Sequence, residues 1–302
     1  MKCLVTGGAG FIGSHIVDAL INQGADVLVC DNLSTGRRQN LNPKARFVEV
    51  DIRSFDESCT LFDGVEYVFH AAALPRIQPS FDQPIEHEEV NVIGTIKCLL
   101  ACNGRNVKKF VLSGSSACYG NPRVTPTPET EAPNCLSPYA LQKYAAEQYC
   151  LLLGSRFDIP VISLRYFNVY GPRSFNPANP YNAYSSVIGI FHEDRRRGTP
   201  LTITGDGTQK RDFVHVADVA RASIAAALSD VTCDAFNVGS GVAVTIRDVA
   251  AMFYHPSEYI PKRQGEAEIT LADITKIRSQ LNWMPTIDLL TGIRSLQHGT
   301  PQ

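Results

Sequence analysis

The chain has 302 residues, of which 44% are hydrophobic and 19% charged, and its formal net charge is −2. This composition is typical of a globular protein with a large core, and the balanced charge provides no general attraction to nucleic acid or to an anionic membrane surface. The nine cysteines are scattered and form no C-x-x-C pair or metal-ligand spacing. We therefore expect a cytoplasmic protein with reduced thiols and no metal. No signal peptide is expected, because Met1 leads directly into a strand pattern, and no apolar run approaches a membrane span.

Short β-branched runs alternate with longer helical patterns over the first two thirds of the chain. The predicted strands, which we expect to be buried on both faces, are residues 3–7, 26–31, 46–51, 67–72, 110–115, 160–167 and 235–240. The predicted helices cover residues 11–23, about 85–103 and 137–153. This βαβ rhythm predicts the α/β class, with a Rossmann-type doubly wound parallel sheet and ligands at the carboxyl ends of its strands.

The pattern changes after residue 168. Residues 169–184 are rich in Pro, Asn and Tyr and predict a long irregular loop that leaves the sheet. Shorter elements follow it, so we predict a Rossmann domain over residues 1–168 and a smaller substrate-binding lobe over residues 169–302. Segments near residues 212–240 are expected to return to the first domain.

The stretch TGGAGFIGSH places Gly7, Gly10 and Gly13 between the first strand and the first helix. Glycines in this arrangement allow a tight turn, close approach of the backbone to a pyrophosphate, and close packing of helix on strand. The N-terminus of the following helix offers free N–H groups and a positive dipole to phosphates. A glycine triplet alone is a weak signal and is often only a flexible turn. Its position in a strand–turn–helix unit favours dinucleotide binding.

Two acidic residues at strand ends refine this prediction. Asp31, at the end of the second strand, can accept both ribose hydroxyls of NAD and would repel the additional phosphate of NADP. Arg37 and Arg38 follow closely and leave NADP open as the second possibility. Asp51 and Ile52, at the end of the third strand, are candidates for contacting adenine, although Asp51 is equally well explained as a strand-end cap.

The stretch SPYALQKY has a structural and a chemical explanation. Ser137 is a good N-cap, Pro138 suits the first helical position, and Lys143 could simply pair with Glu147 one turn on. Tyr139 and Lys143 also share a helix face, which holds an ammonium near a phenol. A nearby cation, together with a positive nicotinamide ring, would lower the pKa of the phenol from about 10 and make it a usable base. The serines of LSGSSACYG, at a strand end, could orient a substrate hydroxyl.

With these residues together, the chain resembles the extended short-chain dehydrogenase/reductase family, and within it the UDP-galactose and UDP-N-acetylglucosamine 4-epimerases. The resemblance covers nearly the whole chain. It rests on the motifs TGGAGFIGSH, DNLSTG, HAAALP, NVIGT, SGSSACYG, SPYALQK, LRYFNVYGPR, GDGTQKRDFVHVADVA, RQGEAEITLAD and LNWMP. This ordered set is specific for the family and less specific for the reaction.

The resemblance implies roles for individual residues. Tyr139 is the base, Lys143 is its partner on the nicotinamide ribose, and Ser115 orients the hydroxyl, with Ser116 as the alternative. The implied NAD contacts are Gly7, Gly10, Phe11, Ile12, Gly13, Asp31, Asn32, Leu33, Ser34, Thr35, Gly36, Asp51, Ile52, Ala71, Ala72, Ala73, Asn91, Tyr139, Lys143 and Phe167. The implied substrate contacts are Ser115, Ser116, Asn168, Arg211, Arg263, Glu266 and Thr270.

Departures from the family pattern narrow the expected reaction. Related dehydratases and decarboxylases commonly carry a glutamate where this chain has Ala117, so the acid needed for eliminating water is missing. Glucuronate enzymes often carry threonine where Asn168 stands, although Arg173 could still pair with a carboxylate. Thr270 falls where some epimerases carry a bulky tyrosine, which leaves room for an N-acetyl group.

We therefore expect NAD-dependent C4 epimerisation of a UDP-hexose through a 4-keto intermediate, with UDP-glucose and UDP-galactose as substrates and the N-acetylated forms also accepted. One alternative is epimerisation or decarboxylation of a UDP-glucuronate on the same scaffold. Another is an NAD-binding regulator without activity. The resemblance also implies a homodimer that pairs the helices near 85–103 and 139–156. No nucleic-acid or membrane partner is expected.

Overall fold

The computed structural model describes residues 1–175, 186–262, 265 and 267–298. The strands are β1 (Lys2–Thr6), β2 (Asp26–Asp31), β3 (Arg46–Glu49), β4 (Tyr67–His70), β5 (Lys109–Ser115), β6 (Val161–Tyr166), β7 (Asn168–Tyr170), β8 (Leu201–Thr204), β9 (Lys210–His215), β10 (Asp234–Val238), β11 (Ala243–Thr245) and β12 (Ser257–Ile260). The α-helices are α1 (Phe11–Asn22), α2 (Ile77–Asp82), α3 (Pro84–Glu88), α4 (Thr95–Leu100), α5 (Pro138–Arg156), α6 (Val187–Arg197), α7 (Val216–Leu228), α8 (Ile246–Ala251), α9 (Thr275–Leu281) and α10 (Leu289–His298). Shorter helical turns are η1 (Arg38–Asn40), η2 (Ile52–Ser54), η3 (Thr60–Phe62), η4 (Glu89–Gly94) and η5 (Ser116–Tyr119).

The central sheet confirms the predicted fold class. Its seven strands are parallel and run in the order β10-β6-β5-β4-β1-β2-β3. The chain builds outward from β1 to β3 and then crosses back to β4 on the other side of β1. The carboxyl ends of β1 and β4 therefore flank the switch point at which ligands bind in such sheets.

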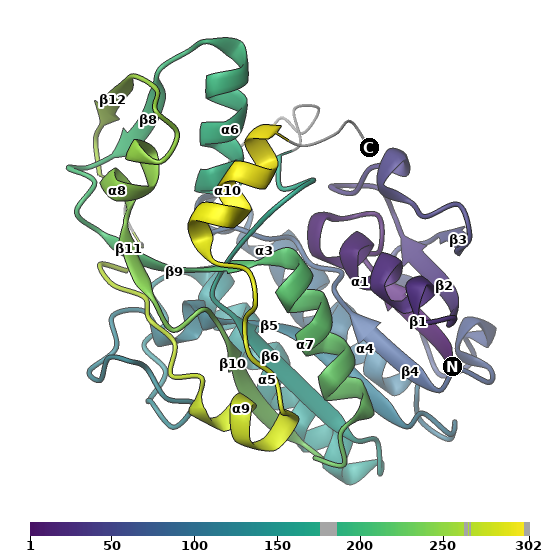
Figure 1. Ribbon diagram of the computed structural model, residues 1–302. Coiled ribbons are helices and arrows are strands. Elements are labelled where there is room, and N and C mark those ends of the chain that lie inside the picture. The colour runs from purple at the N-terminus through teal and green to yellow at the C-terminus, as the bar shows by residue number, and fades with distance from the viewer. Residues whose placement is uncertain (176–185, 263–264, 266, 299–302) are drawn as a thin grey trace.

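Helices cover both faces of this sheet (Figure 1). Alternating side chains of β1 explain the two layers, because Cys3 and Val5 pack in one core cluster with α1 and α7, whereas Leu4 packs in another with α4 and α5. The predicted helix cap is also present, since the Ser137 side chain accepts a hydrogen bond from the Ala140 N–H and Pro138 is the first residue of α5. The sequence signals at this helix start are therefore genuine structural signals.

Three local predictions differ from the structure. The predicted strand 46–51 is not buried on both faces: its core, β3, is the edge strand of the sheet, and its end residues Arg46 and Glu49 are exposed. The predicted helix 85–103 is a helical run interrupted by the π-helical turn η4, which contains the buried Asn91. Part of the predicted loop 169–184 is ordered, because β7 pairs with β9; residues 176–185 lie outside the described part.

A smaller lobe forms beside the sheet and contains β8, β12, α6, α8 and α10 (Figure 1). Its core is a separate cluster that includes Tyr170, Phe191, Phe213 and Phe253. Two later segments join the larger unit, since β10 pairs with β6 and α7 packs on the sheet. The division of the chain at residue 168 stays a prediction.

Candidate functional site

The glycine loop between β1 and α1 has the geometry that its spacing predicts. Gly7 adopts φ +67, which L side chains rarely adopt, and a Cβ there would lie 2.6 Å from the backbone N of Ala72. A Cβ on Gly13 would lie 2.2 Å from the carbonyl oxygen of Gly7. The loop is therefore pressed against the end of β4 and the first turn of α1. Backbone groups of the loop can therefore approach the cavity closely at the helix N-terminus, as a pyrophosphate requires, and Phe11 and Ile12 at the start of α1 line the cavity beside them.

Asp31, at the end of β2, holds the next part of the site. Its carboxylate accepts hydrogen bonds from Ala9 N at 3.0 Å and Leu33 N at 2.8 Å, and burial raises its pKa. Arg38 pairs with Glu49 and lies over the ring of Phe47, so its charge is engaged at the edge strand. The site therefore places an acidic group where the ribose would lie, and the charge of Arg38 is already paired. This combination suits the two ribose hydroxyls of NAD better than the phosphate of NADP.

Asp51 and Asn91 lie near the cofactor end of the cavity and serve the protein's own structure. Asp51 accepts hydrogen bonds from the Arg53 backbone and guanidinium and from Asn32, and the Arg53 bonds lower its pKa to about 2. The capping explanation of Asp51 is therefore present, and the residue also lines the cavity. The Asn91 amide accepts from Leu74 N at 2.8 Å and donates to Leu74 O at 3.0 Å. It thereby fixes the loop that follows β4.

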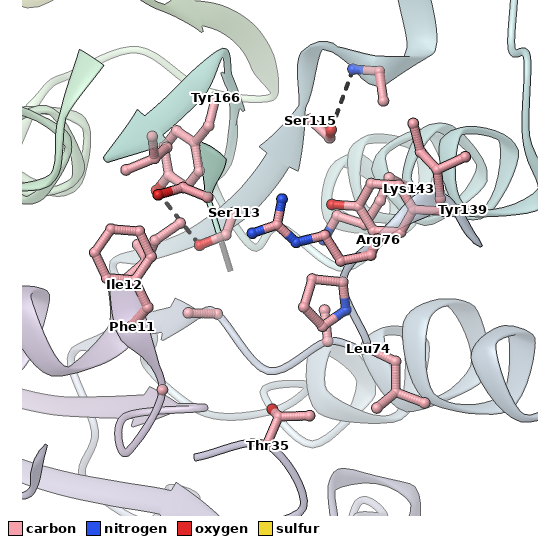
Figure 2. A pocket seen from close by; sticks show the side chains of 18 of the residues that line it. Phe11, Ile12, Thr35, Leu74, Arg76, Ser113, Ser115, Tyr139, Lys143 and Tyr166 are labelled. Atoms are coloured by element: carbon pink, nitrogen blue, oxygen red, sulfur yellow. Dashed lines mark hydrogen bonds between the residues drawn. The ribbon is translucent and has the colours of Figure 1, made fainter. Parts of the chain in front are cut away.

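The structure brings Ser115, Tyr139 and Lys143 to one cavity from two elements (Figure 2). Ser115 ends β5, and Tyr139 is the second residue of α5; Ser115 is near enough to the Tyr139 phenol to lower its pKa. The Ser115 hydroxyl also accepts from Ala117 N at 3.2 Å. Ser116 also lines the cavity, but Ser115 is the serine that acts on the pKa of the phenol. The geometry favours Ser115 over its neighbour for orienting a hydroxyl.

Lys143 lies one turn after Tyr139 and is only 5% exposed. Burial lowers its pKa to about 8, so the ammonium remains the main form at neutral pH. Glu147, the predicted structural partner of Lys143, forms a buried ion pair with Arg165 at 2.6 Å. An ion pair with Glu147 on the helix surface is therefore not the reason for a lysine at position 143.

The pKa of the Tyr139 phenol was expected to fall toward neutrality under a nearby cation and the positive nicotinamide of NAD together. The protein by itself acts in the opposite direction, because burial raises this pKa. The hydrogen bond from Ser115 and the charge of Arg76 act in the lowering direction. The reason is that removal from water disfavours the phenolate more than these groups favour it. The protein alone does not make Tyr139 a base at neutral pH.

The predicted substrate residues divide into described and undescribed ones. Asn168, Arg211 and Thr270 line the same cavity, and the Thr270 hydroxyl donates to Asn168 Oδ1 at 3.1 Å. The Arg211 guanidinium donates to the carbonyls of Lys210 and Glu268. Arg263 and Glu266 lie outside the described residues.

Arg173, the predicted carboxylate partner, pairs with Asp18 of α1 at 2.8 Å. Its charge is therefore engaged between α1 and the segment after β7. The expectation that Arg173 could meet a substrate carboxylate is not supported by this geometry.

Sequence reasoning missed several cavity residues. Thr202 and Thr204 line the cavity from β8 while Leu201 and Ile203 are buried in the smaller lobe, and the alternation in LTIT could have shown this. Arg76 also lines the cavity, from the loop after β4. No local pattern marks it, apart from its position just beyond the carboxyl end of a parallel strand.

The complete cavity has a volume of about 570 Å³ and extends from Asp31, past Tyr139, to Thr202 in the smaller lobe. It is of the size in which small-molecule ligands are enclosed. The Ser115–Tyr139 pair lies between a glycine-loop end suited to a dinucleotide and a second end with polar groups and Arg211. This arrangement can hold two ligands with the reacting atoms meeting at the phenol.

Comparisons with known proteins agree with this arrangement. Residues 3–239 match the model of the NAD dependent epimerase/dehydratase family. A UDP-glucose 4-epimerase of Mycolicibacterium smegmatis is 36% identical over 97% of this chain and 96% of its own length.

Two solved structures are similar over nearly their whole length. The structure of UDP-glucose 4-epimerase from Thermotoga maritima with UDP-glucose has a TM-score of 0.92 and 38% identity, over 99% of this chain and 98% of that one. UDP-N-acetylglucosamine 4-epimerase from Methanobrevibacter ruminantium, in complex with UDP-N-acetylmuramic acid, has a TM-score of 0.91 and 34% identity, over 98% and 97%. The chain therefore belongs to the NAD dependent epimerase/dehydratase family.

Proposed function

We propose that this protein is an NAD-dependent 4-epimerase of UDP-hexoses, acting on UDP-glucose and UDP-galactose and also on their N-acetylated forms. The observation that carries the proposal is the convergence of Ser115, Tyr139 and Lys143 on one cavity, with Ser115 near enough to the Tyr139 phenol to lower its pKa and Lys143 one helical turn away. The similar UDP-sugar epimerases support the choice of reaction.

The residues of this chain divide the proton chemistry between them. Ser115 orients the C4 hydroxyl, and Tyr139 as phenolate accepts its proton. Lys143 provides a buried positive charge on the same helix face, which favours the phenolate. NAD, when bound, contributes the positive nicotinamide ring that takes up the C4 hydrogen as hydride and gives it back. After the 4-keto sugar has rotated in the cavity to present its opposite face, Tyr139 returns the proton. The configuration at C4 is thereby inverted with no net oxidation.

The surroundings of the reacting atoms favour epimerisation over elimination. Ala117 lines the cavity where dehydratases of the family would need an acid. Its backbone N–H donates a hydrogen bond to the Ser115 hydroxyl. Thr270 is small and is held by Asn168 and by the Asp212 N–H, which leaves space beside the sugar. We infer that an N-acetyl group is accepted at this place.

We also propose that the protein forms a homodimer through α5 and the helical run from α3 to α4. On α5, Leu141, Tyr149 and Leu152 are 58%, 48% and 70% exposed and lie along one side of the helix. Ile85 and Ile93 on the neighbouring run are also exposed. A second copy would bury these apolar side chains. Leu152→Glu is expected to convert the dimer to a monomer in light scattering, whereas the exposed substitution Tyr254→Glu should not.

A cytoplasmic location is part of the proposal. The nine cysteines are free thiols, and most of them are buried. Within the described chain, no helix has the length and apolar character needed to cross a membrane. Fractionation of the native host should recover the protein with its cytoplasmic contents.

The reaction is tested by incubating the purified protein with NAD and each of UDP-galactose, UDP-glucose, UDP-N-acetylglucosamine and UDP-N-acetylgalactosamine. NMR of the anomeric protons should show each substrate converting to its C4 epimer without accumulation of free NADH. If protein with bound NAD interconverts none of these sugars, the epimerase proposal is wrong.

A further inference from the structure

Ser80 of α2 is a buried polar residue that contacts the backbone of Tyr139. Its hydroxyl accepts a hydrogen bond from the Tyr139 backbone N–H at 3.0 Å and donates one to the Ile77 carbonyl at 2.6 Å. Ser80 is 0% exposed, so water does not compete for these bonds. One hydroxyl therefore joins α2 to the residue that carries the phenol.

The first turn of α5 explains why the Tyr139 N–H takes an acceptor from another element. The first N–H groups of a helix have no partner within the helix. Pro138 has no N–H, and the Ala140 N–H is bonded to the Ser137 side chain at 3.2 Å. The Tyr139 N–H lies between these two positions, and Ser80 caps it from 59 residues earlier in the sequence.

The other hydrogen bond of Ser80 leads to the wall of the cavity. Ile77, whose carbonyl accepts it, is the first residue of α2 and lines the cavity. The Tyr139 side chain lies in the same cavity (Figure 2). Two consecutive hydrogen bonds thus connect the backbone of the cavity wall with the backbone that holds the phenol, and both of them use the Ser80 hydroxyl.

Resting on the proposed function, we propose that Ser80 is a positioning residue for the reaction, whose hydroxyl fixes the first turn of α5 so that the Tyr139 phenol meets the C4 hydroxyl of the sugar. A displacement of about 1 Å between reacting groups can lower a rate about 10²-fold. A cap that served only the stability of α5 would leave kcat unchanged, so the two roles can be separated by experiment.

The test is Ser80→Ala in the NAD-loaded protein with UDP-galactose as substrate. The substitution leaves the Tyr139 N–H buried without its acceptor, so kcat should fall about 5- to 50-fold. KM should stay within about 3-fold of wild type, because the recorded bonds of Ser80 go to the protein backbone. Bound NAD, measured by absorbance after denaturation, should be unchanged.

The pH profile of kcat gives a second readout that a purely structural cap would not alter. Ser115 and Arg76 act to lower the pKa of the Tyr139 phenol, and Lys143 lies one helical turn away. A displaced phenol loses part of this stabilisation, so its pKa rises. The loss of activity on the acid side should therefore begin at higher pH in Ser80→Ala than in the wild type.

Two further variants control for stability and for volume. Asp288→Ala removes the carboxylate that accepts from the Thr291 N–H at the start of α10, which is a cap in the smaller lobe. It should lower Tm while kcat and its pH profile stay as in the wild type. Ser80→Cys fills nearly the same space with a weaker acceptor, so its kcat should lie between those of the wild type and Ser80→Ala.

Hydrogen exchange at the Tyr139 amide, read by mass spectrometry with peptide fragmentation, tests the bond without turnover. Exchange should be at least about 10-fold faster in Ser80→Ala. Unchanged exchange, a kcat equal to that of Asp288→Ala, or a loss that lies entirely in KM would each overturn the inference. A wild type that does not epimerise UDP-galactose would instead contradict the epimerase proposal, and the exchange result separates the two failures.

Discussion

The cofactor side and the substrate side of the cavity are built differently. On the cofactor side, Gly7, Asp31 and Ser115 are at the ends of strands of one parallel sheet, and backbone packing fixes each of them. On the substrate side, Arg76 lies in the loop before α2, and Thr270 lies in a loop whose hydrogen-bond partner, Asn168, is 102 residues earlier in the sequence. We therefore expect the strand ends to determine the reaction and the loops to determine which sugar undergoes it.

Removing the phenol hydroxyl should have the largest effect. Tyr139→Phe is expected to lower kcat about 10²- to 10⁴-fold, because the base for the C4 hydroxyl is lost. NAD content and Tm should change little, since the ring and its packing remain. Tyr149→Phe, which is exposed on the same helix, serves as the control. Unchanged activity in Tyr139→Phe would support the alternative of an NAD-binding regulator and would contradict the proposed role of the phenol as the base.

The rigidity of the cofactor side can be tested at the buried ion pair that Glu147 of α5 forms with Arg165. The Arg165 guanidinium donates hydrogen bonds to both carboxylate oxygens of Glu147 and to the Tyr119 hydroxyl, the latter at 2.7 Å. These bonds tie α5 to the turn after Ser115. Glu147→Gln leaves a buried guanidinium without its counter-charge, so the free energy of unfolding should fall by about 3–5 kcal/mol in urea titrations.

The matching pair on the substrate side is Lys262–Glu268, whose side chains are 68% and 74% exposed. Glu268→Gln should change the free energy of unfolding by less than about 1 kcal/mol. Similar losses of unfolding free energy in Glu147→Gln and Glu268→Gln would contradict the difference in rigidity between the cofactor side and the substrate side. The double variant Glu147→Leu with Arg165→Met should recover part of the loss.

Selectivity should change at a loop residue without loss of the reaction. Thr270→Tyr fills the space beside the sugar and is expected to lower kcat/KM for UDP-N-acetylgalactosamine about 10- to 100-fold more than for UDP-galactose. Thr270→Ser keeps the hydroxyl that bonds Asn168 and should hold the ratio of the two kcat/KM values within about 3-fold of wild type. An unaltered ratio in Thr270→Tyr would place the N-acetyl group elsewhere.

A further prediction concerns the pH dependence of stability from His70. The Thr95 hydroxyl donates to Asn91 O, so it accepts from His70 Nε2, and the Thr6 hydroxyl donates to Nδ1. Burial lowers the pKa of this neutral imidazole to about 3, whereas in the unfolded chain it is about 6.5. The unfolded state therefore binds the proton first as the pH falls.

The stability that His70 contributes is complete above pH 6.5 and is lost as the pH falls toward 3, by about 1.4 kcal/mol per pH unit. Urea titrations between pH 6 and 4 should show a shallower slope in His70→Gln. The partly exposed His255→Gln on the substrate side should keep the wild-type slope. An identical slope in all three proteins would contradict the assignment.

Much of the fold followed from local patterns. The predicted strands that end at Asp31 and Ser115 lie in the parallel sheet, and the Ser137 cap begins α5 where expected. The edge position of β3 was missed, because burial on both faces depends on which strand lies next to it. The interruption of the helix at Asn91, where the π-helical turn η4 lies, was also missed.

The sequence alone determined the glycine loop, Asp31 and the Tyr139–Lys143 pair, because each is a short-range signal: a turn, a strand end or residues one helical turn apart. The tertiary structure decided which serine meets the phenol, that Glu147 pairs with Arg165 instead of Lys143, and that Arg76 points into the cavity. These contacts join elements from separate parts of the chain. Their geometry depends on how the sheet, α5 and the loops pack together, which local spacing does not encode.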